Sequence, residues 1–120
     1  MKGRVDDSLR ALLDVNVGRT ESEQTSAITV WIDTAFDGFL VFPRALIEAL
    51  GLHQEALAEA ILADGSHVTL ESYICHVDWF GEVVAAQVIA NEGKLPLLGT
   101  ELLANRRLIV DYANRTLSID

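Results

Sequence analysis

One stretch of the sequence, residues 28–42, places a carboxylate at the end of an apolar strand. It reads Ile-Thr-Val-Trp-Ile-Asp-Thr-Ala-Phe-Asp-Gly-Phe-Leu-Val-Phe. The β-branched and aromatic residues before Asp33 favour a strand, and the apolar run resumes after Gly38. Burying a lone carboxylate there costs free energy unless a neighbouring group shares its charge. Asp33 is therefore a candidate functional residue, although a strand-ending aspartate taken alone also fits the cap of a turn.

Composition limits what the protein does. The 120 residues are half hydrophobic and carry a net charge of −9, which predicts one folded domain over residues 1–120 and argues against nucleic-acid binding. No apolar run reaches the roughly 18 residues of a membrane span. The polar N-terminus lacks the apolar stretch of a signal peptide, and the single cysteine, Cys75, excludes an intrachain disulfide. We therefore expect a cytoplasmic protein with no membrane partner.

Alternating apolar residues and turn formers predict many short strands with one or two short helices. Residues 1–8 are expected to be frayed, or to form an edge or interface strand. A helix begins near Pro43, which suits a first helical turn, and ends at Gly51; a second begins at Thr100 and runs through Ala104. The expected strands cover residues 13–17, 27–32, 40–42, 60–63, 66–77, 82–90, 95–98, 108–110 and 117–119.

Two turns connect the longest of these strands. Asp64-Gly65 between apolar runs is a strong hairpin signal, although residues 53–63 are ambiguous between helix and strand. Residues 78–81, Asp-Trp-Phe-Gly, form the second turn. The pattern as a whole predicts a small, mostly β barrel or sandwich.

Three features in order resemble the retropepsin-like aspartic proteases, and most closely the stand-alone prokaryotic type. The first is the strand ending in Asp33-Thr34-Ala35, extended as Phe-Asp-Gly-Phe-Leu. The second is the hairpin around Asp64-Gly65, which corresponds to the flap over the site. The third is Leu97-Leu98-Gly99, followed by a short helix and terminal strands. The resemblance covers residues 9–119.

This resemblance implies a closed, mostly β acid-protease barrel that forms a homodimer and hydrolyses peptide bonds as an aspartic-type endopeptidase. Two carboxylates about 3 Å apart cannot both ionise, so one serves as base and the other as acid toward a water between them. The chain carries one such signature, and a two-fold axis would supply the second Asp33 from another copy. Thr34 would brace the two loops, the Ala35 amide would support the carboxylate, and neither a metal nor an organic cofactor would be required.

The resemblance also implies which residues contact a peptide or protein substrate. Asp37 and Gly38 would line the cleft, with Asp37 accepting a hydrogen bond from substrate backbone. The flap tip, Asp64-Gly65-Ser66, would cover the substrate. Two residues depart from the family pattern. Ala35 replaces the usual glycine, which is tolerable if its φ is negative, and Thr100 stands where viral relatives carry an arginine that pairs with the aspartate equivalent to Asp37.

Other interpretations remain open at this point. One alternative is that the same fold serves as a non-catalytic dimerisation or peptide-binding module, in which Ala35 and Thr100 reflect relaxed chemistry. A β-rich small-molecule binder would need an enclosed pocket and a monomer. Cys75 and His76 lie on opposite faces of one strand, which argues against a shared metal and against a Cys-His nucleophile pair.

Overall fold

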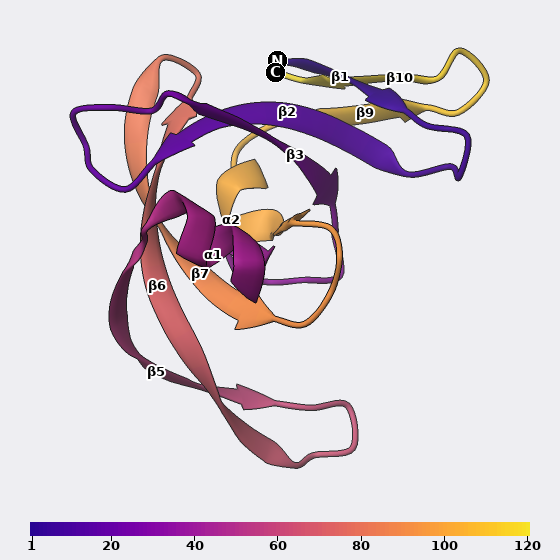
Figure 1. Cartoon of the computed structure of the whole chain (residues 1–120). Coiled ribbons are helices and arrows are strands. Elements are labelled where there is room, and N and C mark those ends of the chain that lie inside the picture. Colours follow the sequence, from indigo (N-terminus) through magenta and orange to yellow (C-terminus); the bar gives the residue numbers. More distant parts are fainter.

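The protein is described by a computed structural model that covers the backbone of residues 1–120 and every side chain except those of residues 56–58 and 60. It is mostly β, with two short helices (Figure 1). The elements are β1 (Lys2–Val5), β2 (Ala11–Gly18), β3 (Ser26–Ile32), β4 (Leu40–Pro43), α1 (Arg44–Leu50), β5 (His53–Ile61), β6 (His67–Trp79), β7 (Glu82–Asn91), β8 (Leu97–Leu98), α2 (Thr100–Leu103), β9 (Leu108–Asp111) and β10 (Thr116–Ile119).

Alternation along β2 shows how the sequence selects its buried face. Leu13, Val15 and Val17 are buried, whereas Asp14 and Asn16 between them are exposed. Successive side chains of a strand point to opposite faces, so one face of β2 packs into the core and the other faces solvent. The core continues through apolar side chains of most other elements, among them Val30, Leu40, Phe42, Val77, Val88, Leu98, Leu117 and Ile119.

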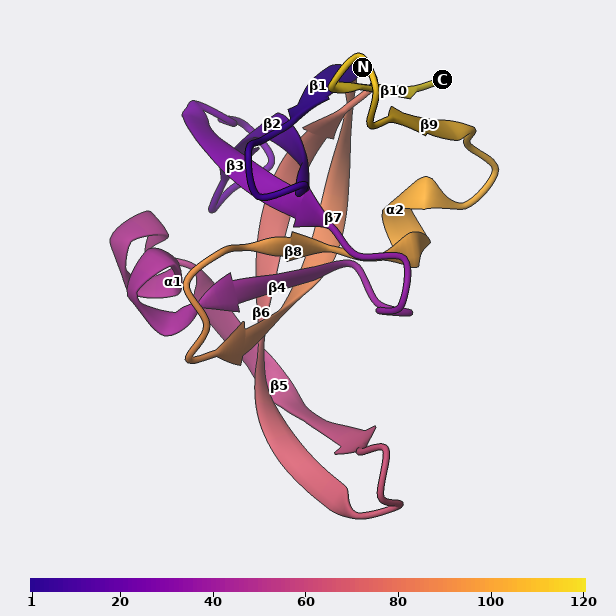
Figure 2. The same cartoon turned by 90° about the vertical axis from the view of Figure 1, so that its right-hand side faces the viewer.

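The strands form one sheet in the order β5-β6-β7-β4-β8-β3-β2-β1-β10-β9. A further pairing joins Val17 of β2 to Val77 of β6, so the strands between these two close into a ring. Two of the pairings are parallel, β3 with β8 and β4 with β7. The β5–β6 hairpin extends away from the ring, as Figures 1 and 2 both show.

The N-terminal segment differs from the expectation of a frayed or edge strand. Residues of β1 pair with β10 on one side and with β2 on the other. The Met1 ammonium donates a hydrogen bond to the Ile119 carbonyl at 2.7 Å, which places the two termini side by side (Figure 1). The sequence pattern missed this because the partner of β1 lies at the opposite end of the chain.

Three further boundaries correct the sequence-based predictions. The strand expected at residues 60–63 is β5, which begins at His53 because it pairs with β6 along its length. The apolar segment 95–98 contributes only Leu97–Leu98 as strand. The turn expected at residues 78–81 is shorter, because Phe80 and Gly81 both have positive φ, as a two-residue type I′ turn requires, and Trp79 pairs with Glu82.

Candidate active site

Asp33 lies directly after β3, at the start of a loop that leads to β4. Its backbone N–H donates a hydrogen bond to the Leu98 carbonyl at 2.9 Å, and its carbonyl accepts one from the Phe36 N–H at 3.2 Å. The Asp33 carboxylate accepts a hydrogen bond from the Ala35 N–H at 3.0 Å. The side chain is partly exposed. Asp33 is therefore held by its backbone, while its carboxylate is accessible to a reacting group.

The segment after β8 holds the rest of this loop in place. The Gly99 N–H donates to the Phe39 carbonyl at 2.8 Å, and the Glu101 N–H donates to the Gly38 carbonyl at 3.1 Å. Thr100 donates twice to the Phe36 carbonyl, from its N–H at 2.9 Å and from its hydroxyl at 3.3 Å. The neutral Thr100 side chain and its N–H thus anchor the loop through one backbone carbonyl.

Gly99 is required here by space. A Cβ at this position would lie 2.3 Å from the Gly38 carbonyl oxygen and 2.5 Å from a carbon of the Phe36 ring. The first of these atoms belongs to the backbone, so it cannot move aside without moving the Asp33 loop. The glycine in the Leu97-Leu98-Gly99 motif therefore permits two backbone segments to approach closely.

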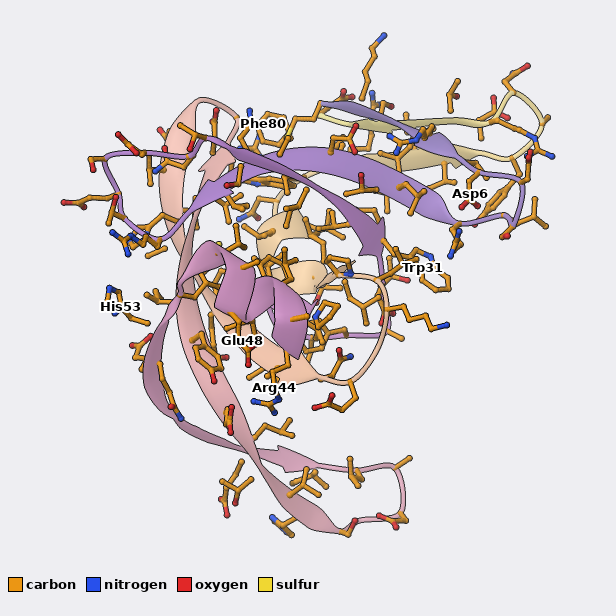
Figure 3. The ribbon with its side chains drawn as sticks, in the orientation of Figure 1. Asp6, Trp31, Arg44, Glu48, His53 and Phe80 are labelled. Atoms are coloured by element: carbon orange, nitrogen blue, oxygen red, sulfur yellow. The ribbon has the colours of Figure 1, made fainter. Side chains whose placement is uncertain are left out.

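Ala35 occupies its position without backbone strain. Ala35 is absent from the non-glycine residues with positive φ in the chain as described, which are Leu9, Phe80, Asn105 and Arg115. Its methyl group is therefore compatible with the local conformation. Thr34 and Ala35 are both exposed, and they line a shallow pocket of about 370 Å³ together with Asp33 and the apolar residues Trp31, Ile32 and Leu97. Figure 3 shows Trp31 at the end of β3.

A larger groove of about 620 Å³ lies between the Asp33 loop, the β5–β6 hairpin and β7. Phe36, Asp37 and Gly38 line it from the loop, and Glu59, Ile61 and Leu70 line it from the hairpin. Sequence reasoning identified Asp37 and Gly38 but missed the hairpin residues. Ile61 is an apolar residue that is 70% exposed in the structure, and sequence periodicity did not place it at the groove because the pairing that brings the hairpin there is non-local.

The predicted flap tip forms a tight turn at the end of the hairpin. The Asp64 carboxylate accepts hydrogen bonds from the Ser66 hydroxyl at 2.6 Å and from the Ser66 N–H at 2.9 Å, and these bonds lower the pKa of Asp64. Gly65 supplies a positive φ. Asp64, Gly65 and Ser66 do not line the groove. The structure therefore groups Asp33, Thr34 and Ala35 at one pocket and Asp37 and Gly38 at another, with the hairpin tip separate from both.

An ionic cluster attaches the hairpin to the body of the protein. Arg44 of α1 pairs with Glu71 of β6 and with Glu92 beyond β7, and the Tyr73 hydroxyl donates to Glu71 at 2.7 Å. These contacts, the Tyr73 hydroxyl first and Arg44 next, lower the pKa of Glu71. Arg44 extends from α1 toward the hairpin in Figure 3. The cluster fixes the base of the hairpin and leaves its tip unanchored.

Cys75 is fully buried in the core, where its thiol contacts the Gly18 carbonyl at 3.8 Å. Burial raises the pKa of the thiol to about 12. The thiolate is the reactive form, so the folded protein at about pH 8 should resist alkylation by iodoacetamide over hours, whereas urea-unfolded protein should react within minutes. Mass spectrometry of the labelled protein measures this, and equal labelling rates in both states would contradict the assigned burial.

Over the residues with described side chains, no group of three or more His, Cys, Asp or Glu is arranged to hold a metal ion. Within the same set, no helix has the length and apolar character needed to cross a membrane.

Comparison with known proteins identifies the fold to which this site belongs. No family model matches the sequence, and no curated protein matches it. Among solved structures, a retropepsin-like aspartic protease from Rickettsia conorii superposes with a TM-score of 0.68 at 13% identity, covering 98% of this chain and 86% of that chain. EIAV protease in complex with the inhibitor HBY-793 gives a TM-score of 0.56 at 18% identity, over 80% of this chain and 86% of that chain. The chain therefore has the fold of the retropepsin-like aspartic proteases, as its sequence motifs predict.

Proposed function

We propose that the protein is an aspartic-type endopeptidase in which the Asp33 carboxylates of two copies hold and activate a water. The observation that carries the proposal is the position of Asp33 within this fold. It follows β3 directly, its backbone is fixed by β8, and its carboxylate is accessible beside an open pocket. The structural neighbours are aspartic proteases by name, which supports the same class of reaction.

The chemistry requires a base for the attacking water and an acid for the oxygen of the scissile carbonyl. A carboxylate takes a proton from the water as it attacks, and a carboxylic acid protonates the carbonyl oxygen. Two carboxyl groups in contact share one proton, so the pair supplies both functions at once and titrates as a unit. This reaction takes neither a metal nor an organic cofactor.

A second copy is proposed because one chain contributes one Asp33. A two-fold axis beside the Asp33 loop would place the same residue on both sides. Exposed apolar side chains support such a contact, since Trp31 is 39% and Ile109 45% exposed. In the sheet order, β5 and β9 are the two terminal strands, whereas β1 and β10 are paired on both sides. Of the two terminal strands, β9 carries the exposed Ile109. The interface strand is therefore expected at β9 rather than at residues 1–8.

The remaining predicted residues take supporting roles in this proposal. Thr34 would brace the two loops across the axis, and the Ala35 amide, which already donates to Asp33, would orient the carboxylate. Asp37 and Gly38 would contact an extended peptide in the groove. The turn at Asp64, Gly65 and Ser66 would close over that peptide, which would pair with the hairpin as an added strand.

The test is cleavage of a denatured protein mixture by the purified chain at pH values from about 3 to about 7, because the carboxyl pair must hold one shared proton to supply both a base and an acid. We expect new termini at internal peptide bonds and a specific activity that falls on dilution, as a dimer dissociates. A folded, dimeric protein that binds unfolded chains without cutting them would instead identify a peptide-binding module. Absence of both cleavage and binding would overturn both functions.

A further inference from the structure

The groove of about 620 Å³ combines an apolar wall with exposed carboxylates. Val41, Ile61, Leu70 and Ile89 supply apolar side chains from β4, the hairpin and β7. Asp37 and Glu59 bring carboxylates from two separate elements, and both side chains are exposed. Among the described side chains, the lining contains no lysine, arginine or histidine. Any occupant of the groove therefore meets aliphatic surface and negative charge together.

These carboxylates differ from the acidic residues at the base of the hairpin. Glu71 and Glu92 are already paired with Arg44. Asp37 and Glu59 take part in none of the ion pairs found between described side chains. The net charge of −9 adds a negative field around the whole molecule, which attracts cationic ligands at low ionic strength.

We propose that this groove binds a lysine or arginine side chain of an extended peptide substrate; the inference rests on the proposed peptidase function. The alkyl stem of a basic residue packs against apolar surface while its charged head stays near water. In this groove the stem would cover the aliphatic wall, and the head would lie between Asp37 and Glu59. A glutamate would place a third negative charge there, and an uncharged aliphatic residue would leave both carboxylates without a partner.

The experiment uses peptides of one scaffold that differ at a single position, which carries lysine, norleucine or glutamate. That position is moved in turn to each site flanking the scissile bond. At one or more of these positions, we expect the lysine peptide to have a kcat/KM about tenfold or more above that of the glutamate peptide. Its kcat/KM should also be about threefold above that of the norleucine peptide. The preference should fall as salt is raised, because the carboxylates are exposed.

Two variants and a binding measurement show whether the preference for lysine arises from this groove. Glu59→Gln should reduce the lysine-to-glutamate ratio about threefold or more, whereas Glu82→Gln, an exposed residue of the other hairpin, should leave it unchanged. Equal ratios in wild type and Glu59→Gln, or a ratio near one in wild type, would overturn the inference.

The binding measurement distinguishes failure of this inference from failure of the proposed function. Fluorescence anisotropy of the same labelled peptides is measured on the wild type at a pH where no cleavage occurs and on Asp33→Asn. If no peptide is cleaved but the lysine peptide binds more tightly than the glutamate peptide, the peptidase proposal fails and the preference of the groove for a basic side chain stands. If cleavage occurs and neither assay distinguishes the three peptides, the groove inference fails and the peptidase proposal stands. Absence of both cleavage and peptide binding overturns both.

Discussion

Asp33→Asn is expected to reduce cleavage of denatured protein at least about a thousandfold, because general acid–base catalysis contributes up to roughly 10⁴-fold and both members of the pair are changed in every dimer. An amide can neither take the proton from water nor return it to the carbonyl oxygen. The measurement is the rate of appearance of new amino termini at matched protein concentration.

The fold should survive this change. The Asp33 carboxylate accepts a hydrogen bond from the Ala35 N–H, and the oxygen of an asparagine side chain can accept the same bond. Circular dichroism and the thermal midpoint should therefore match those of the wild type. Asp7→Asn, at an exposed loop position paired with Arg115, is the matched charge control and should retain activity. Equal cleavage by Asp33→Asn and wild type would remove Asp33 from the mechanism.

Gly99→Ala is expected to lower the free energy of unfolding by about 3 kcal/mol and the thermal midpoint by roughly 10 °C. The added methyl carbon would lie 2.3 Å from the Gly38 carbonyl oxygen and 2.5 Å from the Phe36 ring. Relief requires the Asp33 loop and the segment after β8 to separate, which also breaks hydrogen bonds between them. Peptidase activity should fall with stability, and more steeply, because the loop positions Asp33.

Gly93→Ala is the matched control for this substitution. A Cβ at Gly93 would meet only the end of the Asn91 side chain, at 3.2 Å, and that side chain can rotate. Its effect on unfolding should stay within about 1 kcal/mol. Urea titrations of both variants measure the difference, and equal stability of the two would contradict the close approach at Gly99.

The elements that carry local signals were predictable from sequence. The strand before Asp33 was expected at residues 27–32 and is β3, Ser26–Ile32, because its β-branched run ends in a carboxylate and turn formers. Gly51 ends α1 with a φ of 66°, as glycine at a helix C-terminus does. The fold was predictable because the Asp33 motif and the Leu97-Leu98-Gly99 motif occur in the order that resembles the retropepsin-like proteases. In the structure the two motifs lie on paired strands, β3 and β8.

Features that depend on distant partners were not predictable. The start of β5 is set by pairing with β6, and β1 lies within the sheet because it pairs with β10 at the other end of the chain. Glu59 and Leu70 reach the groove only through the hairpin that carries them. Periodicity describes which face of a strand is buried, but it does not specify which strand or groove that face contacts.

Mixing wild-type and Asp33→Asn subunits tests the central claim, that one Asp33 from each of two copies makes the site. After subunit exchange at constant total protein, activity should follow the square of the wild-type fraction, so that an equal mixture retains about a quarter of the wild-type activity. An equal mixture that retains about half, with activity proportional to the wild-type fraction at every ratio, would show that each chain works alone and would contradict the account.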